Sequence, residues 1–167
     1  MSNYISSLLV EYRNQGIVID TNILLLWVVG TVNPKRIEKF SPTDCFNLQD
    51  YELLLPIIDY FQKIVTTANI LTEVNSFLNK LREPERSQSL LILAKATENL
   101  EEIYLPSSQV VTHPKFTTFG LTDSGIVEIS RNQYLVLTDD LKLWSYLNNS
   151  GIAAINFNHI RELGWAV

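Results

Sequence analysis

Residues 16–27 read GIVIDTNILLLW, and this stretch sets the fold class of the chain. The β-branched run Ile17–Ile19 ends at Asp20, and the apolar run Ile23–Trp27 follows after two polar residues. An uninterrupted apolar run of this kind is typical of a strand buried on both faces, as in a parallel sheet. Asp20 then lies at the carboxyl end of the strand, which is the edge where open α/β sheets bind ligands.

Helical and extended patterns alternate along the rest of the chain. Helices are predicted at residues 2–14, 21–30, 51–63, 68–81, 84–103, 121–131 and 141–149. Short strands are predicted at residues 16–20, 64–66, 134–138 and 152–156, with a short helix inside irregular chain at 33–49. Gly30 is expected to end its helix, and Thr67 to cap the next one. This alternation predicts an α/β fold with a central parallel sheet.

Length and composition favour one globular domain. The 167 residues are enough to bury a substantial core, and 46% hydrophobic with 19% charged residues is ordinary for such a domain. Residues 1–15 are expected to form an N-terminal helical extension to the domain at 16–167. The single cysteine, Cys45, excludes an internal disulfide and is typical of a reducing compartment.

The sequence predicts a soluble, cytoplasmic protein without membrane contact. The N-terminus lacks the basic and small-residue signals of a leader peptide, and no apolar run is long enough to span a bilayer. The net charge of −5 argues against broad non-specific nucleic-acid binding, but it leaves a nucleic acid open as a substrate.

Acidic residues recur at the predicted carboxyl edge of the sheet. Asp20 and the pair Asp139 and Asp140 follow strands directly. Asp123 lies in the first turn of a helix, and Glu73 borders the apolar stripe of another. Right-handed crossovers between parallel strands bring these positions to one end of the sheet. Carboxylates gathered there repel one another unless protons or cations neutralise them.

Each acid also has a simpler interpretation. An aspartate between a strand and a helix is a favourable N-cap, and Glu73 alone is typical of a solvated helix edge. It is the combination that favours a site. Oxygen ligands with no His or Cys cluster favour Mg²⁺ or Mn²⁺ over zinc. His113 and His159 lack the spacing of metal ligands and are expected to be surface or turn residues.

At these positions the chain resembles the PIN-domain family of metal-dependent ribonucleases. The matching segments are VIDTN at 18–22, TTANILTEV at 66–74, LTDSGI at 121–126 and VLTDD at 136–140. The resemblance implies a three-layer PIN-like fold, with helices on both faces of a central parallel sheet and an acidic pocket at its carboxyl edge.

The resemblance also implies the site residues. Asp20, Glu73, Asp123 and Asp140 match the catalytic and metal-binding positions, and Asp139 is the second choice for the last of them. The implied reaction is hydrolysis of RNA phosphodiester bonds with one or two Mg²⁺ or Mn²⁺ ions. We expect Asp20 and Asp123 to bind metal directly, and Glu73 and Asp140 to act partly through bound waters.

Further residues support this assignment. Thr21, Asn22 and Thr138 match small polar positions that orient carboxylates or water in the family. The basic residues expected to contact phosphate, with ordinary solvated helix faces as the alternative, are Lys35, Arg36, Lys39, Lys80, Arg82 and Arg86.

The resemblance implies partners as well. It implies a homodimer and, if the chain is the toxin of a type II toxin–antitoxin module (VapC-like), an antitoxin protein that covers the acidic groove. The helix before the first strand and the long interval from Asp20 to Glu73 leave open whether the chain is a toxin or another PIN ribonuclease.

Two other functions remain as alternatives. One is a non-catalytic PIN-like module that binds a protein. The other is a phosphatase with Asp20 as its nucleophile, which the sequence disfavours because such enzymes carry a second acid two residues later, where this chain has Asn22.

Overall fold

The computed structural model describes the backbone of residues 2–163 and the side-chain surroundings of residues 4–162. A five-stranded parallel sheet lies at the centre, in the order β3-β2-β1-β4-β5. Its strands are β1 (Ile17–Ile19), β2 (Ile64–Thr66), β3 (Glu101–Glu102), β4 (Leu135–Thr138) and β5 (Ala154–Asn156). Every residue of β1 and β4 is buried, which explains their unbroken apolar sequences.

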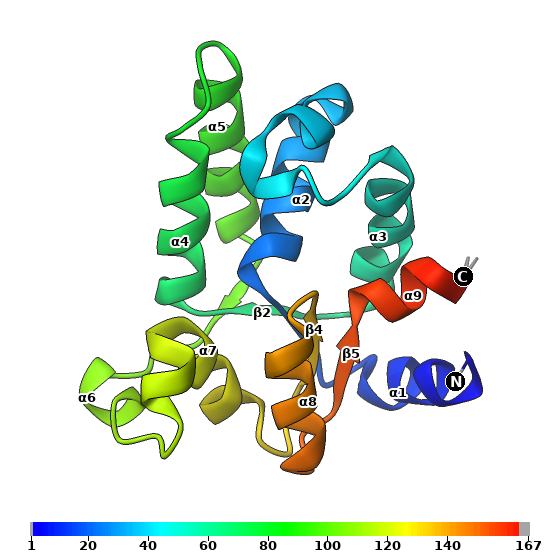
Figure 1. The fold of residues 1–167 in the computed structure, drawn as a ribbon, viewed down its shortest axis with the longest axis vertical. Helices are drawn as coiled ribbons and strands as arrows, with labels where there is room; N and C mark the ends of the chain where they lie inside the picture. The colour runs from blue at the N-terminus through cyan, green and yellow to red at the C-terminus, as the bar shows by residue number, and fades with distance from the viewer. Residues whose placement is uncertain (1, 164–167) are drawn as a thin grey trace.

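Helices cover both faces of this sheet (Figure 1). On one face lie α2 (Thr21–Val32), α3 (Leu48–Tyr60), α4 (Ala68–Leu78) and α5 (Glu85–Thr97). On the other lie α7 (Phe116–Ser130) and α8 (Leu141–Asn149). This arrangement confirms the predicted three-layer α/β fold with a central parallel sheet. Among the described residues, no helix is both long and apolar enough to cross a membrane.

Shorter elements complete the chain. The first helix, α1 (Ser2–Tyr12), inserts Ile5, Leu8 and Leu9 into the hydrophobic core that also holds the strands. Between α2 and α3 the chain forms the 3-10 helices η1 (Pro34–Lys39) and η2 (Ser41–Thr43). The remaining helices are α6 (Ser107–Val110) and α9 (Phe157–Leu163), the second of which packs against β5.

The order of the strands places a topological switch point beside β1. The chain leaves β1 toward β2 and β3 on one side, and later returns to β4 and β5 on the other. Val18 in β1 pairs with Val65 of β2 and with Val136 of β4, so the carboxyl ends of these strands lie side by side. Open α/β sheets bind ligands in the crevice at such a point.

The prediction that Gly30 ends its helix is wrong. α2 continues to Val32 and ends at Asn33, whose backbone N–H still bonds to Val29. Gly30 instead serves a close approach between α2 and α3, because a Cβ atom there would overlap the ring of Tyr51. Glycine at this position therefore reflects helix packing, which a sequence pattern does not reveal.

Other boundaries differ where tertiary contacts decide them. The predicted helix at 84–103 stops at Thr97, because the chain then pairs with β2 as the edge strand β3. Its two residues, Glu101 and Glu102, are exposed and carry no apolar pattern. The helix at 121–131 was expected to begin at Leu121, and α7 is interrupted immediately before it, at Gly120 with φ of 71°.

Candidate active site

The five predicted acidic residues come from four elements around the switch point. Asp20 follows β1, and Asp139 and Asp140 follow the neighbouring strand β4. Glu73 projects from α4 and Asp123 from α7, and these two helices contact each other. The structure therefore brings together positions up to 120 residues apart in sequence, at the edge where ligands bind in such folds.

Asp20 is buried at the centre of this group, with 6% of its surface exposed. Its Oδ1 accepts a hydrogen bond from the Thr21 backbone N–H at 2.6 Å, and its Oδ2 accepts one from the Thr138 hydroxyl at 2.5 Å. Burial raises the pKa of Asp20 to about 6, although these two hydrogen bonds act in the opposite direction. Repulsion from Asp139 and Asp140 adds to the increase.

Glu73 links three helices through its two carboxylate oxygens. The Thr21 hydroxyl of α2 donates to Oε2 at 2.9 Å, and the Thr122 hydroxyl of α7 donates to Oε1 at 2.6 Å. Sequence reasoning identified Thr21 but missed Thr122. The only signal for Thr122 was its place beside Asp123 in the LTDSGI segment.

The pKa of Asp123 depends on the other acids of the site. It is partly buried, and within the described residues its carboxylate accepts no hydrogen bond. Burial, together with repulsion from Asp20, Asp140 and Glu73, raises its pKa to about 7. The side chain of Lys142 at the start of α8 is the cation that opposes this increase. Four carboxylates therefore repel one another, and little positive charge nearby compensates for this repulsion. A bound divalent cation relieves it.

Asp139 and Asp140 are adjacent in sequence but have different partners. Asp140 caps α8, because its Oδ1 accepts from the backbone N–H groups of Lys142 at 2.6 Å and Leu143 at 3.0 Å. It also contributes to the field at Asp123. The Asp139 carboxylate instead accepts from the Asn22 amide at 3.2 Å, and burial raises its pKa.

Thr138 connects the acids of the two central strands. Its hydroxyl donates to Asp20 and accepts from the backbone N–H of Asp140 at 3.0 Å. Thr21, Asn22 and Thr138 thus each donate to a carboxylate, as expected for polar residues that orient the acids.

A second group, which the sequence gave no sign of, supports this edge from α9. The Asn158 amide donates to the backbone carbonyl of Asp139 at 3.0 Å. Arg161 donates to Asn158 at 2.9 Å, to Asp50 at 2.6 Å and to the Cys45 carbonyl at 3.1 Å. Because α9 is absent from the predicted elements, neither residue could be placed beside the site in advance.

The predicted phosphate-binding residues have mixed surroundings. Arg36 forms an ion pair with Glu85 at 2.6 Å, and Arg86 forms one with Glu83 at 2.9 Å. The Lys80 ammonium lies over the ring of Phe77. The remaining three side chains, Lys35, Lys39 and Arg82, are exposed.

The histidines are structural. His113 lies in a turn, one of the two positions expected for it, and its side chain is buried rather than at the surface. Its ring packs edge-on against Tyr146, and its Nδ1 accepts from the Lys115 backbone N–H at 3.1 Å. His159 packs against Trp144. Neither is near enough to other ligands to form a metal site in the part of the chain that the structure describes.

The donor set has the chemistry of a hard divalent cation site. It consists of carboxylates, and burial and mutual repulsion raise the pKa values of three of them, Asp20, Asp123 and Asp139. In the orientations shown, no three acidic, His or Cys side chains of the described residues converge on one point. The hydroxyl donors Thr21, Thr122 and Thr138 hold the oxygens of Asp20 and Glu73 in these orientations.

No protein-family model matches the chain, and no curated protein matches it either. Any assignment of function therefore depends on the geometry of the acidic site and on the short motifs around it.

Proposed function

We propose that this chain is a Mg²⁺- or Mn²⁺-dependent endoribonuclease of the PIN type. The observation that carries the proposal is the gathering of acids from four elements at one edge of the sheet, where hydroxyl groups bind the oxygens of Asp20 and Glu73. Burial and repulsion from three other carboxylates, which raise the pKa of Asp123, agree with it. A cluster of acids whose burial and mutual repulsion disfavour ionisation is typical of functional sites. The order and spacing of the four motifs support the same assignment.

The residues of the chain have distinct roles in this proposal. Asp20 and Asp123 hold the metal directly, as the resemblance implies, and burial together with repulsion from neighbouring acids raises the pKa of both. Glu73 and Asp140 complete the site, and the hydroxyls of Thr21, Thr122 and Thr138 fix the carboxylates in place. A bound Mg²⁺ or Mn²⁺ supplies an activated water and stabilises charge on the leaving oxygen of a phosphodiester.

The test is cleavage of a mixed RNA pool by the purified protein with Mn²⁺, Mg²⁺ or EDTA. Asp20→Asn removes the charge but keeps an N-cap for α2, because asparagine caps helices as well as aspartate does. The matched control is Asp59→Asn, at an exposed position on α3. We expect metal-dependent cleavage by wild type and by the Asp59 variant, and none by the Asp20 variant.

Melting curves recorded beside the assay separate loss of activity from loss of folding. A folded wild-type protein that cleaves no RNA with either metal would refute the ribonuclease proposal and favour a non-catalytic binding module. Equal cleavage by wild type and Asp20→Asn would refute the site assignment.

Cellular context belongs to the same proposal. The exposed free thiol of Cys45 suits a reducing compartment such as the cytoplasm. The resemblance supports a homodimer and, for a toxin, an antitoxin that covers the acidic groove. Light scattering of the purified protein tests the dimer, and growth arrest on expression, relieved by Asp20→Asn, tests the toxin.

A further inference from the structure

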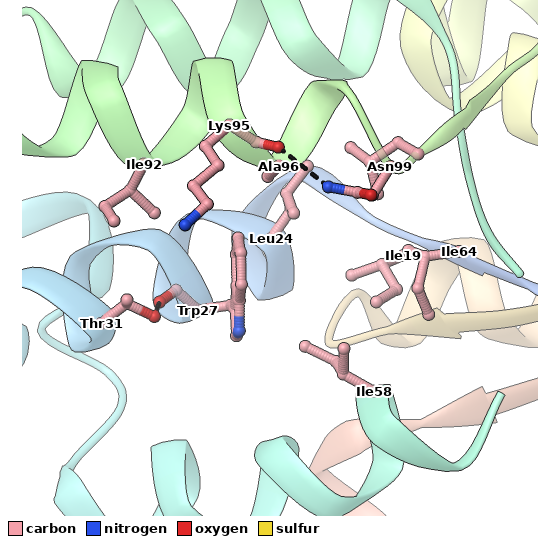
Figure 2. A pocket seen from close by; sticks show the side chains of 11 residues that line it. Ile19, Leu24, Trp27, Thr31, Ile58, Ile64, Ile92, Lys95, Ala96 and Asn99 are labelled. Atoms are coloured by element: carbon pink, nitrogen blue, oxygen red, sulfur yellow. Dashed lines mark hydrogen bonds between the residues drawn. The ribbon is translucent and has the colours of Figure 1, made fainter. Parts of the chain in front are cut away.

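A mostly apolar cavity lies between α2, α3 and α5 (Figure 2). It has a volume of about 370 Å³, and none of the five acidic site residues lines it. Its base is formed by Ile19 of β1 and Ile64 of β2, and its walls include Trp27, Ile58 and Ile92. Cavities that bind small molecules have volumes of this order and mostly apolar linings.

The lining combines apolar side chains with one cation. Lys95 of α5 is the charged residue among the described residues that line the cavity. Figure 2 shows its side chain running from α5 toward α2, beside Trp27. Within the described residues its ammonium forms no ion pair. Lys95 is exposed, so its charge lies in solvent while the lining itself includes no acid, and this favours an anionic over a cationic ligand.

Two of the other polar groups of the lining are already engaged. The Thr31 hydroxyl donates to the Trp27 backbone carbonyl at 2.7 Å. The Asn99 amide donates to the Lys95 backbone carbonyl at 3.2 Å. Within the described residues, the Lys95 ammonium and the Trp27 indole N–H have no hydrogen-bond partner, so both can donate to a ligand carboxylate.

We propose that this cavity binds an amphipathic monocarboxylate. Its alkyl or aryl chain lies against the isoleucines and Trp27, and its carboxylate pairs with Lys95. The cavity has the size of one small molecule, whereas a docked protein segment covers a far larger surface. This site is independent of the proposed ribonuclease activity.

The test uses decanoate as the probe, with decylamine and butyrate as comparisons. Isoleucine methyl groups are labelled with ¹³C and followed by NMR during each titration. We expect saturable decanoate shifts at Ile19, Ile58, Ile64 and Ile92, and none at Ile5 in the core under α1. Decanoate should bind about threefold more tightly than decylamine, as expected for an ion pair with an exposed lysine, and butyrate should bind weakly because it covers little of the apolar lining.

Two variants locate the determinants. Lys95→Met keeps the aliphatic stem and should weaken decanoate binding about threefold, with no loss for decylamine. Lys115→Met, at an exposed lysine outside the cavity, is the matched control and should change nothing. Ala96→Phe fills part of the cavity and should abolish binding of both probes.

Several outcomes would overturn the proposal. One is that decanoate does not saturate the protein up to roughly 1 mM, which is the weak end of specific binding. The others are equal affinity for decanoate and decylamine, and chemical-shift changes that extend to Ile5. Undiminished binding by a folded Ala96→Phe variant, verified by its melting curve, would also refute it.

Discussion

Replacing Asp123 by asparagine should stabilise the metal-free protein. The carboxylate sits among three other acids, and it accepts no hydrogen bond from the described residues that the substitution would remove. In the unfolded chain its pKa is near the ordinary 3.8, whereas in the folded protein burial and repulsion raise it to about 7. At neutral and higher pH the carboxylate is already ionised in the unfolded chain, so folding has to move a charge into an unfavourable place, and asparagine avoids that cost.

The magnitude follows from the two pKa values. A rise from 3.8 to about 7 corresponds to about 4 kcal/mol at about 1.4 kcal/mol for each pH unit. Because Asp123 is partly exposed, solvent screening reduces this by about half, to about 2 kcal/mol. For a protein of this size that is a gain of about 4–8 °C in melting temperature.

The sign also gives a pH dependence. A raised folded-state pKa contributes stability that is complete below the unfolded pKa and is lost as pH rises through the folded one. Wild type should therefore lose stability between about pH 4 and pH 7, and the variant should lose less. The difference between the two proteins is then absent at pH 4 and largest above pH 7.

The assay is thermal unfolding in EDTA across this pH range, with Asp59→Asn as the matched control. That exposed aspartate on α3 lies outside the acid cluster, so its variant should melt like wild type at every pH. The reasoning is refuted if Asp123→Asn is no more stable than wild type at pH 8. An equal gain at pH 4 and pH 8 would also refute it, because the cause would then not be ionisation.

Three further predictions follow from the same geometry. Mn²⁺ should raise the melting temperature of wild type at pH 8 but not at pH 5. At pH 5, Asp20 and Asp123, with pKa values of about 6 and 7, are protonated in the folded protein. Equal shifts in melting temperature at both pH values would contradict this prediction. Thr138→Val removes the donor to Asp20 and the acceptor for the Asp140 N–H. Urea unfolding should therefore show a loss of about 1–3 kcal/mol in the free energy of unfolding, together with weaker Mn²⁺ binding. Unchanged Mn²⁺ affinity would mean that the hydroxyl does not orient the carboxylate. Gly30→Ala should lower the free energy of unfolding by about 1–3 kcal/mol, because the added methyl group overlaps the ring of Tyr51 on α3. Combining it with Tyr51→Ala should recover part of that loss. Additive losses would mean that the two residues do not clash.

Local patterns were sufficient for much of the fold. The buried strand Ile17–Ile19 and the helix that begins after Asp20 were readable because burial on both faces leaves an unbroken apolar run. The cap at Thr67 and the bounds of α8, Leu141–Asn149, also agree with the structure, since capping chemistry and helical periodicity act within a few residues. Features that depend on distant partners were missed, such as the polar edge strand at Glu101 and Glu102.

The candidate site shows the same division. The positions of the acids after strands were visible in the sequence, but the different directions of Asp139 and Asp140 were not. The Thr122 bond to Glu73 spans 49 residues, and its existence depends on how α4 packs against α7.

By itself, the sequence determined the α/β class, the parallel sheet and the acidic residues at its carboxyl edge, because strand burial and helix starts are encoded in neighbouring residues. Only the tertiary structure decided which carboxylates lie close enough to repel one another, which hydroxyls donate to them and where the apolar cavity lies. The bond from Thr138 to Asp20 joins residues 118 apart, and the bond from Arg161 to Asp50 joins residues 111 apart. Such contacts exist only once the core has packed, since burial, and with it the rise in pKa, is a property of the assembled layers.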